Sequence, residues 1–218
     1  KTDLSHINDL DYYEQGRFME LDLTARRNLE LTETLRDREK RGSLLWVLDK
    51  TRTPMGGRLL RSWLERPLLS VTAIAKRNAA VAALVESTMA REELIAALTG
   101  LGDMERLIGR IVYGTAGGRD MVSLRSAIER LPALRAQLAA FSGGRLAELA
   151  GELDDLTEIG AHIGAAICDE PPFSVREGGF IRDGYHEEVD RLRHIMNGGK
   201  GVLAEIEAKA VSYTHLRA

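Results

Sequence analysis

The chain has 218 residues, of which 44% are hydrophobic and 29% charged, with a formal net charge of −3 and a pI near 6.0. This is the balance of a soluble globular protein with a real core, and it excludes a bulk positive field that would gather nucleic acid, although a local basic face stays open. No apolar run approaches the roughly 20 residues that span a bilayer, and the single cysteine, Cys168, excludes an internal disulfide.

The N-terminal stretch KTDLSHINDLDYYEQ has neither the apolar core of a signal peptide nor an initiator Met. We therefore expect a chain that begins within a larger protein, with the cytosol as the default compartment. The next stretch, GRFMELDLTARRNLEL, alternates polar and apolar residues over 18–24, which weakly indicates a strand.

The pattern becomes helical from Thr53 onward. Thr53 can cap a helix whose first position suits Pro54, and Pro67 marks its end. Further helical patterns begin at Ser70, Thr88 and Asp103 and cover 119–141 and 156–167. Proline lacks the donor that a helix interior needs, so Pro132 should kink or split the pattern over 119–141.

The stretch PPFSVREGGFIRDGY over 171–185 breaks the helical pattern with two prolines and two strong turn signals. Val175-Arg176 and Phe180-Ile181 are predicted to pair as a small hairpin. A long helical pattern resumes after Tyr185 and continues to Ile206. The sequence thus predicts an all-α fold with one or two short β elements and a long C-terminal helix.

The NGGKG cluster over 197–201 invites comparison with a nucleotide phosphate loop. That loop requires G-x-x-x-x-G-K followed by Ser or Thr, between a strand and a helix. Here Gly201 follows Lys200, and His194 stands where the first glycine belongs. The cluster is therefore interpreted as a weak point within a long helix, or a turn between its two halves.

Other candidate chemistry is equally sparse. His162 and Cys168, and His186 and His194, lack the spacing of metal ligands, and no second pair completes a site. The adjacent carboxylates at 154–155 and 187–188 would point apart on helices and make poor acid–base couples. We therefore expect no catalytic, cofactor-binding or metal-binding residues, and no enzymatic activity, in this chain.

Four long stretches resemble the core domain of the bacterial MutS family of DNA mismatch repair proteins. They are FMELDLTARRNLELTETLR, GSLLWVLDKTRTPMGGRLLRSWLERPL, DMERLIGRIVYGTAGGRDMVSLRSAI and REGGFIRDGYHEEVDRLRHI, within a resemblance that covers about 2–208. The positions assigned to the family's structural motifs are Asp22, Arg26, Arg27, Asn28, Pro54, Met55, Gly56, Arg58, Trp63, Arg106, Arg119, Asp120, Gly178, Gly179 and Gly184.

The resemblance implies a domain organisation. Residues 1–16 would be the end of a connector region, 17–184 the first half of a helical core domain, and 185–210 the start of a lever helix toward a DNA clamp. The tail VSYTHLRA over 211–218 departs from the family and is expected to be non-native, because it resembles translated adaptor sequence.

The resemblance also implies a function. The chain would be a structural lever that couples a C-terminal ATPase, absent here, to DNA clamping and mismatch recognition. The intact protein would be a DNA-dependent ATPase that uses ATP and Mg, acts with a second MutS subunit on mismatched double-stranded DNA, and engages a repair factor of the MutL type. It would work in the bacterial cytoplasm at the nucleoid, without a membrane.

Two alternatives and one candidate interface stay open. The chain could be a free-standing helical interaction module derived from a MutS core, without ATPase or mismatch-reading activity. A MutS-like branch that lacks the mismatch-reading domain is a weaker alternative, since the connector-like start argues against it. On the lever helix, Arg191, Arg193 and Lys200 are candidate contacts to the DNA backbone, against the simpler interpretation of a solvated face.

Overall fold

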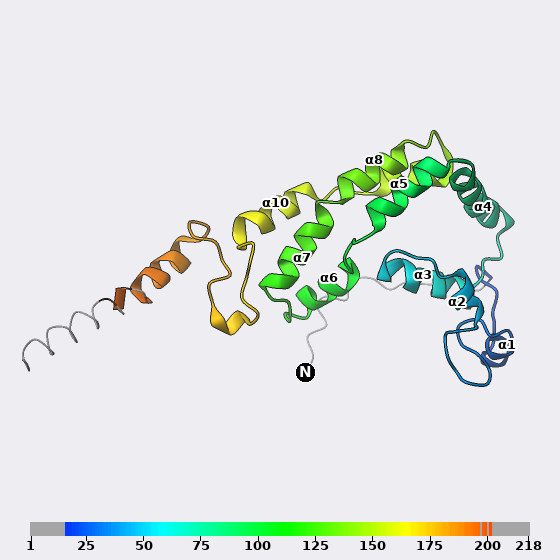
Figure 1. Ribbon diagram of the computed structural model, residues 1–218, viewed down its shortest axis with the longest axis horizontal. Coiled ribbons are helices and arrows are strands. Elements are labelled where there is room, and N and C mark those ends of the chain that lie inside the picture. Colours follow the sequence, from blue (N-terminus) through cyan, green and yellow to red (C-terminus); the bar gives the residue numbers. More distant parts are fainter. Residues whose placement is uncertain (1–15, 197, 200, 202–218) are drawn as a thin grey trace, which may run out of the picture.

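The computed structural model describes residues 16–196, 198–199 and 201, and these form an elongated array of helices (Figure 1). The helices are α1 (Leu23–Asn28), α2 (Leu44–Leu48), α3 (Pro54–Glu65), α4 (Val71–Glu86), α5 (Thr88–Leu98), α6 (Met104–Val112), α7 (Gly118–Ile128), α8 (Leu131–Ala139), α9 (Gly144–Glu152), α10 (Thr157–Ala166), the 3-10 helix η1 (Val175–Glu177) and a further helix over 187–196. The predicted all-α fold is confirmed.

Side-chain caps explain where several helices begin. Thr53 accepts a hydrogen bond from the Gly56 amide at 3.1 Å, and Pro54 takes the first position of α3, as predicted. Ser70 and Asp103 cap α4 and α6 in the same way. Pro132 splits the long middle pattern, because α7 ends at Ile128 and α8 begins at Leu131 with the proline in its first turn.

The β elements are smaller than the sequence suggested. Within the described residues they are two isolated antiparallel bridges, Phe18 with Leu68 and Ile167 with Ile181. The strand indicated over 18–24 is wrong beyond Phe18, because Asp22 accepts the Ala25 amide at 2.6 Å and starts α1.

The predicted hairpin between Val175-Arg176 and Phe180-Ile181 is also wrong. Ser174 caps the 3-10 helix over Val175–Glu177, which ends at Gly178 with a φ of 71°. The following segment turns back to the end of α10 instead, where the Cys168 amide donates to the Phe180 carbonyl at 3.0 Å. The capping box of the 3-10 helix and the left-handed glycine therefore determine the pairing.

Two buried apolar clusters hold the middle of the molecule. The first lies between α7 and α10 and contains Leu101, Leu124, Ala127, Ile128, Leu131, Ile163, Ala166 and Ile167. The second lies between α8 and α9 and contains Leu134, Leu138, Leu146 and Ala150. Gly160 lets α10 approach α7 closely, because a Cβ there would lie 3.0 Å from Ile128 Cγ2.

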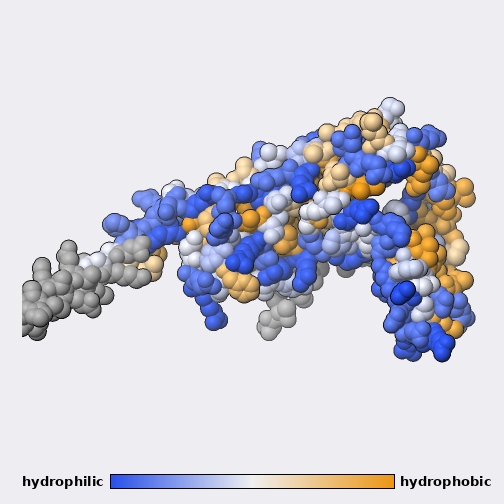
Figure 2. Space-filling view, in the orientation of Figure 1, coloured by the Kyte–Doolittle hydropathy of each residue, from blue (hydrophilic) through white to orange (hydrophobic). Residues whose placement is uncertain are grey.

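The two ends of the array have little apolar core. Around α1 and α2 the buried side chains are Leu31, Ser43 and Leu45. Figure 2 shows hydrophobic surface gathered at the end of the molecule where Figure 1 places α1, α2 and α4. The exposed apolar residues of α4 recur at helical spacing: Val71, Ile74, Val81 and Val85. Among the described residues, no helix is long and apolar enough to cross a membrane.

This exposed apolar surface should make the isolated chain self-associate or unfold without a sharp transition, since apolar patches of this kind are usually covered. Val81→Gln with Val85→Gln should shift the chain toward monomer, whereas Thr72→Gln with Asn78→Gln, on polar positions of the same helix, should not. Sedimentation velocity and calorimetry measure both effects. A monodisperse monomer with a sharp cooperative melt would contradict the expectation.

Candidate functional site

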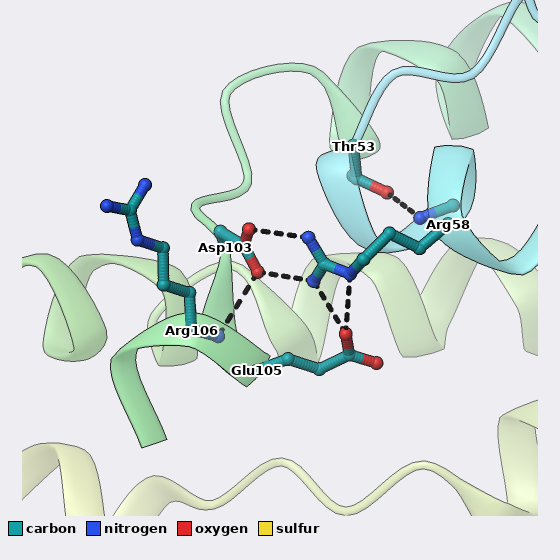
Figure 3. A network of polar contacts seen from close by, with 6 residues as sticks. Thr53, Arg58, Asp103, Glu105 and Arg106 are labelled. Atoms are coloured by element: carbon teal, nitrogen blue, oxygen red, sulfur yellow. Dashed lines mark hydrogen bonds and ion pairs between the residues drawn. The ribbon is translucent and has the colours of Figure 1, made fainter. Parts of the chain in front are cut away.

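One candidate site is an arginine clamp between α3 and α6 (Figure 3). Arg58, on α3, donates two hydrogen bonds to the Asp103 carboxylate at 2.8 and 2.7 Å. It donates two more to Glu105 Oε2, at 3.0 and 2.6 Å. Asp103 also accepts the Arg106 amide at 3.3 Å, so the residue that caps α6 holds α3 as well. We name Arg58, Asp103 and Glu105 the Arg58 clamp.

The charges of the clamp favour its ionised form. The hydrogen bond from Arg58 lowers the pKa of Asp103, and the hydrogen bond to Asp103 raises the pKa of Arg58. A fork of this geometry fixes the orientation of both partners. Because the Arg58 side chain is 49% exposed, the clamp contributes more to positioning than to stability.

A second candidate site lies where the chain leaves α10. Arg182 Nε donates to the Gly164 and Ile167 carbonyls at 2.7 and 2.9 Å, and so satisfies the end of α10. Its Nη2 donates to Asp169 at 2.7 Å, and Arg125 of α7 donates to the same carboxylate oxygen at 3.0 Å. The hydrogen bond from Arg182, and to a smaller extent the one from Arg125, lowers the pKa of Asp169.

The helix over 187–196 is attached to this point by further polar contacts. Arg193 donates to the Ile181 carbonyl at 3.0 Å and pairs with Asp183 and Asp190. The Tyr185 hydroxyl lies 3.0 Å from His162 Nε2 on α10. We name Arg182, Asp169, Tyr185 and Arg193, with these contacts, the α10 joint.

A turn at Gly184 sets the direction of that helix. Gly184 has a φ of 82°, which favours glycine, and its amide donates to Asp190 at 2.8 Å. The apolar side chains Leu192, Ile195 and Met196 of the same helix are 53%, 57% and 62% exposed. Polar contacts therefore attach this helix to the rest of the molecule.

The structure distributes the predicted motif residues along the chain and does not gather them in one cavity. Several serve helix ends: Asp22 caps α1, Pro54 and Gly56 form the first turn of α3, and Asp120 accepts the Gly117 amide at 2.8 Å. Others join segments: Arg26 donates to the Leu21 carbonyl at 3.0 Å, Arg119 donates to the Pro171 carbonyl at 3.2 Å, and Met55 packs on the first apolar cluster. The rest lie in α1, α3, α6 and the turns before 187: Arg27, Asn28, Trp63, Arg106, Gly178, Gly179 and Gly184.

The candidate DNA contacts occupy different environments. Arg191 is exposed and pairs with Glu188 through bonds of 2.8 and 2.7 Å. Arg193 belongs to the α10 joint, and Lys200 lies outside the described residues. Gly198, Gly199 and Gly201, the described part of the NGGKG cluster, are helical.

The sequence did not predict the acidic partners of Arg58 and Arg125. Asp103 and Glu105 lie 45 and 47 residues from Arg58, and Asp169 lies 44 residues from Arg125. No periodicity connects positions so far apart. Across the part of the chain that the structure describes, no three His, Cys, Asp or Glu side chains gather as a metal site would require.

Comparison with known proteins gives one family. The model of MutS domain III matches residues 24–217. The whole chain aligns at 45% identity with a protein named DNA mismatch repair protein MutS from Desulforamulus reducens. It aligns at 46% identity with a protein of the same name from Symbiobacterium thermophilum, and it covers 25% of the length of each. The protein of the same name from Lachnoclostridium phytofermentans is 42% identical, and the chain covers 23% of its length. The chain therefore spans about a quarter of the length of these relatives.

The Arg58 clamp predicts a local effect of substitution. Arg58→Gln should speed hydrogen exchange at the start of α6 and in α3, because both lose their shared partner. Arg61→Gln is the matched control, since Arg61 pairs with Glu65 at 2.9 Å within α3. Hydrogen–deuterium exchange read by mass spectrometry measures both, and equal protection in the two variants would contradict the clamp.

The same clamp has a defined pH dependence. Its stabilisation is present above the ordinary Asp pKa of 3.8 and is lost as the pH falls through the lower pKa of folded Asp103. The difference in thermal midpoint between the parent chain and Arg58→Gln should therefore shrink only at pH values below 3.8, the ordinary Asp pKa.

Proposed function

The chain belongs to the MutS domain III family, and from this premise we propose that it is the lever of a bacterial DNA mismatch repair protein. In this proposal it couples an ATPase elsewhere in the protein to a DNA clamp and to mismatch recognition. The segment itself performs no catalysis, and the intact protein is a DNA-dependent ATPase that uses ATP and Mg. The domain limits proposed are a connector end over 1–16, a core over 17–184, a lever helix over 185–210 and a non-native tail over 211–218.

The partners proposed follow from the same premise. They are mismatched double-stranded DNA, a second copy of the MutS subunit and a downstream factor of the MutL type. The compartment proposed is the bacterial cytoplasm, at the nucleoid. The similarity to a quarter of much longer repair proteins supports the lever over the free-standing interaction module, and no contact among the described residues favours that module.

The α10 joint is the observation that carries the lever proposal. A lever transmits force only if its arm turns together with its base. Here the arm, over 187–196, has exposed apolar residues, so its attachment depends on Arg182, Tyr185 and Arg193. Asp169 receives arginines from both sides of the joint, which extends the attachment to α7.

The geometry of the joint favours rotation as a unit over bending. Arg182 bonds two carbonyls and a carboxylate at once, and Arg193 bonds a carbonyl and pairs with two carboxylates. Bending at the joint would have to break several of these bonds together. Movement of the arm should therefore carry α7 and α10 along with it.

In the intact protein, Arg182→Gln should uncouple the two ends of the lever. ATP-driven release from mismatched DNA should slow roughly fivefold or more, the lower range of typical coupling energies, while ATP binding and affinity for the mismatch without nucleotide stay near the parent values. Arg176→Gln, the same charge change on the exposed 3-10 helix, is the control. Release kinetics by stopped-flow fluorescence decide the outcome, and parent-like release in Arg182→Gln would contradict the lever.

The proposed DNA contacts have a separate test. Arg191→Glu, Arg193→Glu and Lys200→Glu together should reduce the dependence of log Kd on log salt by about 0.9 for each phosphate that the variant no longer neutralises. Arg193 already donates to the Ile181 carbonyl. The double variant Arg191→Glu with Lys200→Glu should therefore produce most of the change in the salt slope. An unchanged salt slope in the triple variant would reject binding of these residues to the DNA backbone.

A further inference from the structure

A basic cavity lies at the other end of the molecule, away from the α10 joint. It has a volume of about 610 Å³ and lies between the segment before α1, the start of α4 and α9. Its cationic lining is Arg17, Lys76, Arg77 and Arg145. The backbone places Arg17 there, because the Met19 amide donates to the Pro67 carbonyl at 2.8 Å and Phe18 forms its bridge with Leu68.

The charges in this cavity are only partly balanced. Lys76 pairs with Glu148 at 2.7 Å, and Arg145 pairs with Glu148 at 3.3 Å and with Glu152 at 2.7 Å. Among the described residues, four cations therefore share two carboxylates, which leaves two positive charges in excess. This excess is local, since the whole chain has a net charge of −3.

The two unbalanced cations lie against aromatic rings. The Arg77 guanidinium is 3.6 Å from the centre of the Trp63 ring, and that of Arg17 is 5.4 Å from the centre of the Phe18 ring. Within the described part of the chain, neither has a carboxylate at ion-pair distance. Burial and then the nearby charge of Arg145 lower the pKa of Arg77, as expected for a cation without a counterion.

Backbone donors add to this field. Ser70 caps α4 and lines the cavity together with Ala73, so the first turn of a 16-residue helix faces it. That first turn contains no acidic residue. Amide groups at a helix start attract anions, and here they reinforce side-chain cations from three separate segments.

We propose that this cavity binds phosphate groups, with Arg17, Lys76, Arg77 and Arg145 as the ligand-binding cations. The cations come from three segments around a cavity far larger than one carboxylate, an arrangement that suits several linked phosphates. Arginine forks and a lysine point charge are the usual donors to phosphate oxygens. The phosphates come either from a free polyphosphate or from the backbone of DNA, and the site is independent of the lever proposal.

The test uses the 218-residue chain in the Val81→Gln, Val85→Gln background that is expected to be monomeric, since neither residue lines the cavity. Circular dichroism verifies that each variant keeps its helix content. Sodium tripolyphosphate and a short DNA duplex are titrated separately by calorimetry, with polyglutamate as a carboxylate polymer for comparison. Arg77→Gln with Arg145→Gln should weaken phosphate binding roughly tenfold or more, since each charge-assisted bond is worth about that factor. Arg36→Gln with Arg41→Gln removes the same charge from an exposed loop and should leave binding within about twofold, because neither side chain lines the cavity.

A second pair of substitutions protects the test against misfolding. Arg17→Gln with Lys76→Gln leaves the stack of Arg77 on Trp63 in place and should also weaken binding. In a Trp46→Phe background Trp63 is the single tryptophan of the chain, and its emission should change during the phosphate titration and locate the ligand beside Arg77.

The titrations separate the sources of phosphate. Binding of tripolyphosphate alone identifies a site for free phosphates, and binding of the duplex, with the same sensitivity to both cavity pairs, identifies the DNA backbone. The proposal is overturned if neither ligand binds, if the cavity variants bind like the Arg36 and Arg41 control, or if polyglutamate binds as tightly as the phosphates.

Discussion

The attachment of the helix over 187–196 depends chiefly on two guanidinium groups: Arg193 bonds the helix to the segment before it, and Arg182 bonds that segment to α10. Arg182 satisfies the end of α10 through the Gly164 and Ile167 carbonyls and at the same time holds Asp169, which Arg125 of α7 also binds. Apolar packing cannot replace these two groups, since the arm presents its own apolar residues to solvent. The lever proposal therefore rests on directional hydrogen bonds, which fix orientation better than apolar contact does.

The same principle recurs at the Arg58 clamp, where α3 and α6 meet through a fork and two carboxylates. The first apolar cluster, between α7 and α10, lies between these two polar contacts, and the second packs α8 and α9 against α4 and α5. The result is a long body with a firm centre and polar connections toward each end (Figure 1). Such a body suits the transmission of movement better than chemistry, in agreement with the function proposed for this family member.

Local sequence signals predicted much of the fold. The cap at Thr53 and the break at Pro132 act within one or two helical turns, so their residue types are sufficient. The hairpin over 175–181 failed because a left-handed Gly178 ends a 3-10 helix and redirects the chain to Ile167. The motif resemblance identified Arg58 but neither Arg125 nor Arg182. The acidic partners of Arg58 and Arg125 could not be predicted either, since the tertiary fold brings together positions more than 40 residues apart.

The central claim is that the arm and its base move as one body, and a distance measurement tests it most directly. Spin labels at Glu158→Cys on α10 and His194→Cys on the arm, with Cys168→Ala, would report the distance across the α10 joint in the intact protein by pulsed electron resonance. The lever account predicts one narrow distance distribution that is the same with and without ATP. A broad distribution, or one that shifts when ATP binds, would show that the joint is a hinge and would contradict the account.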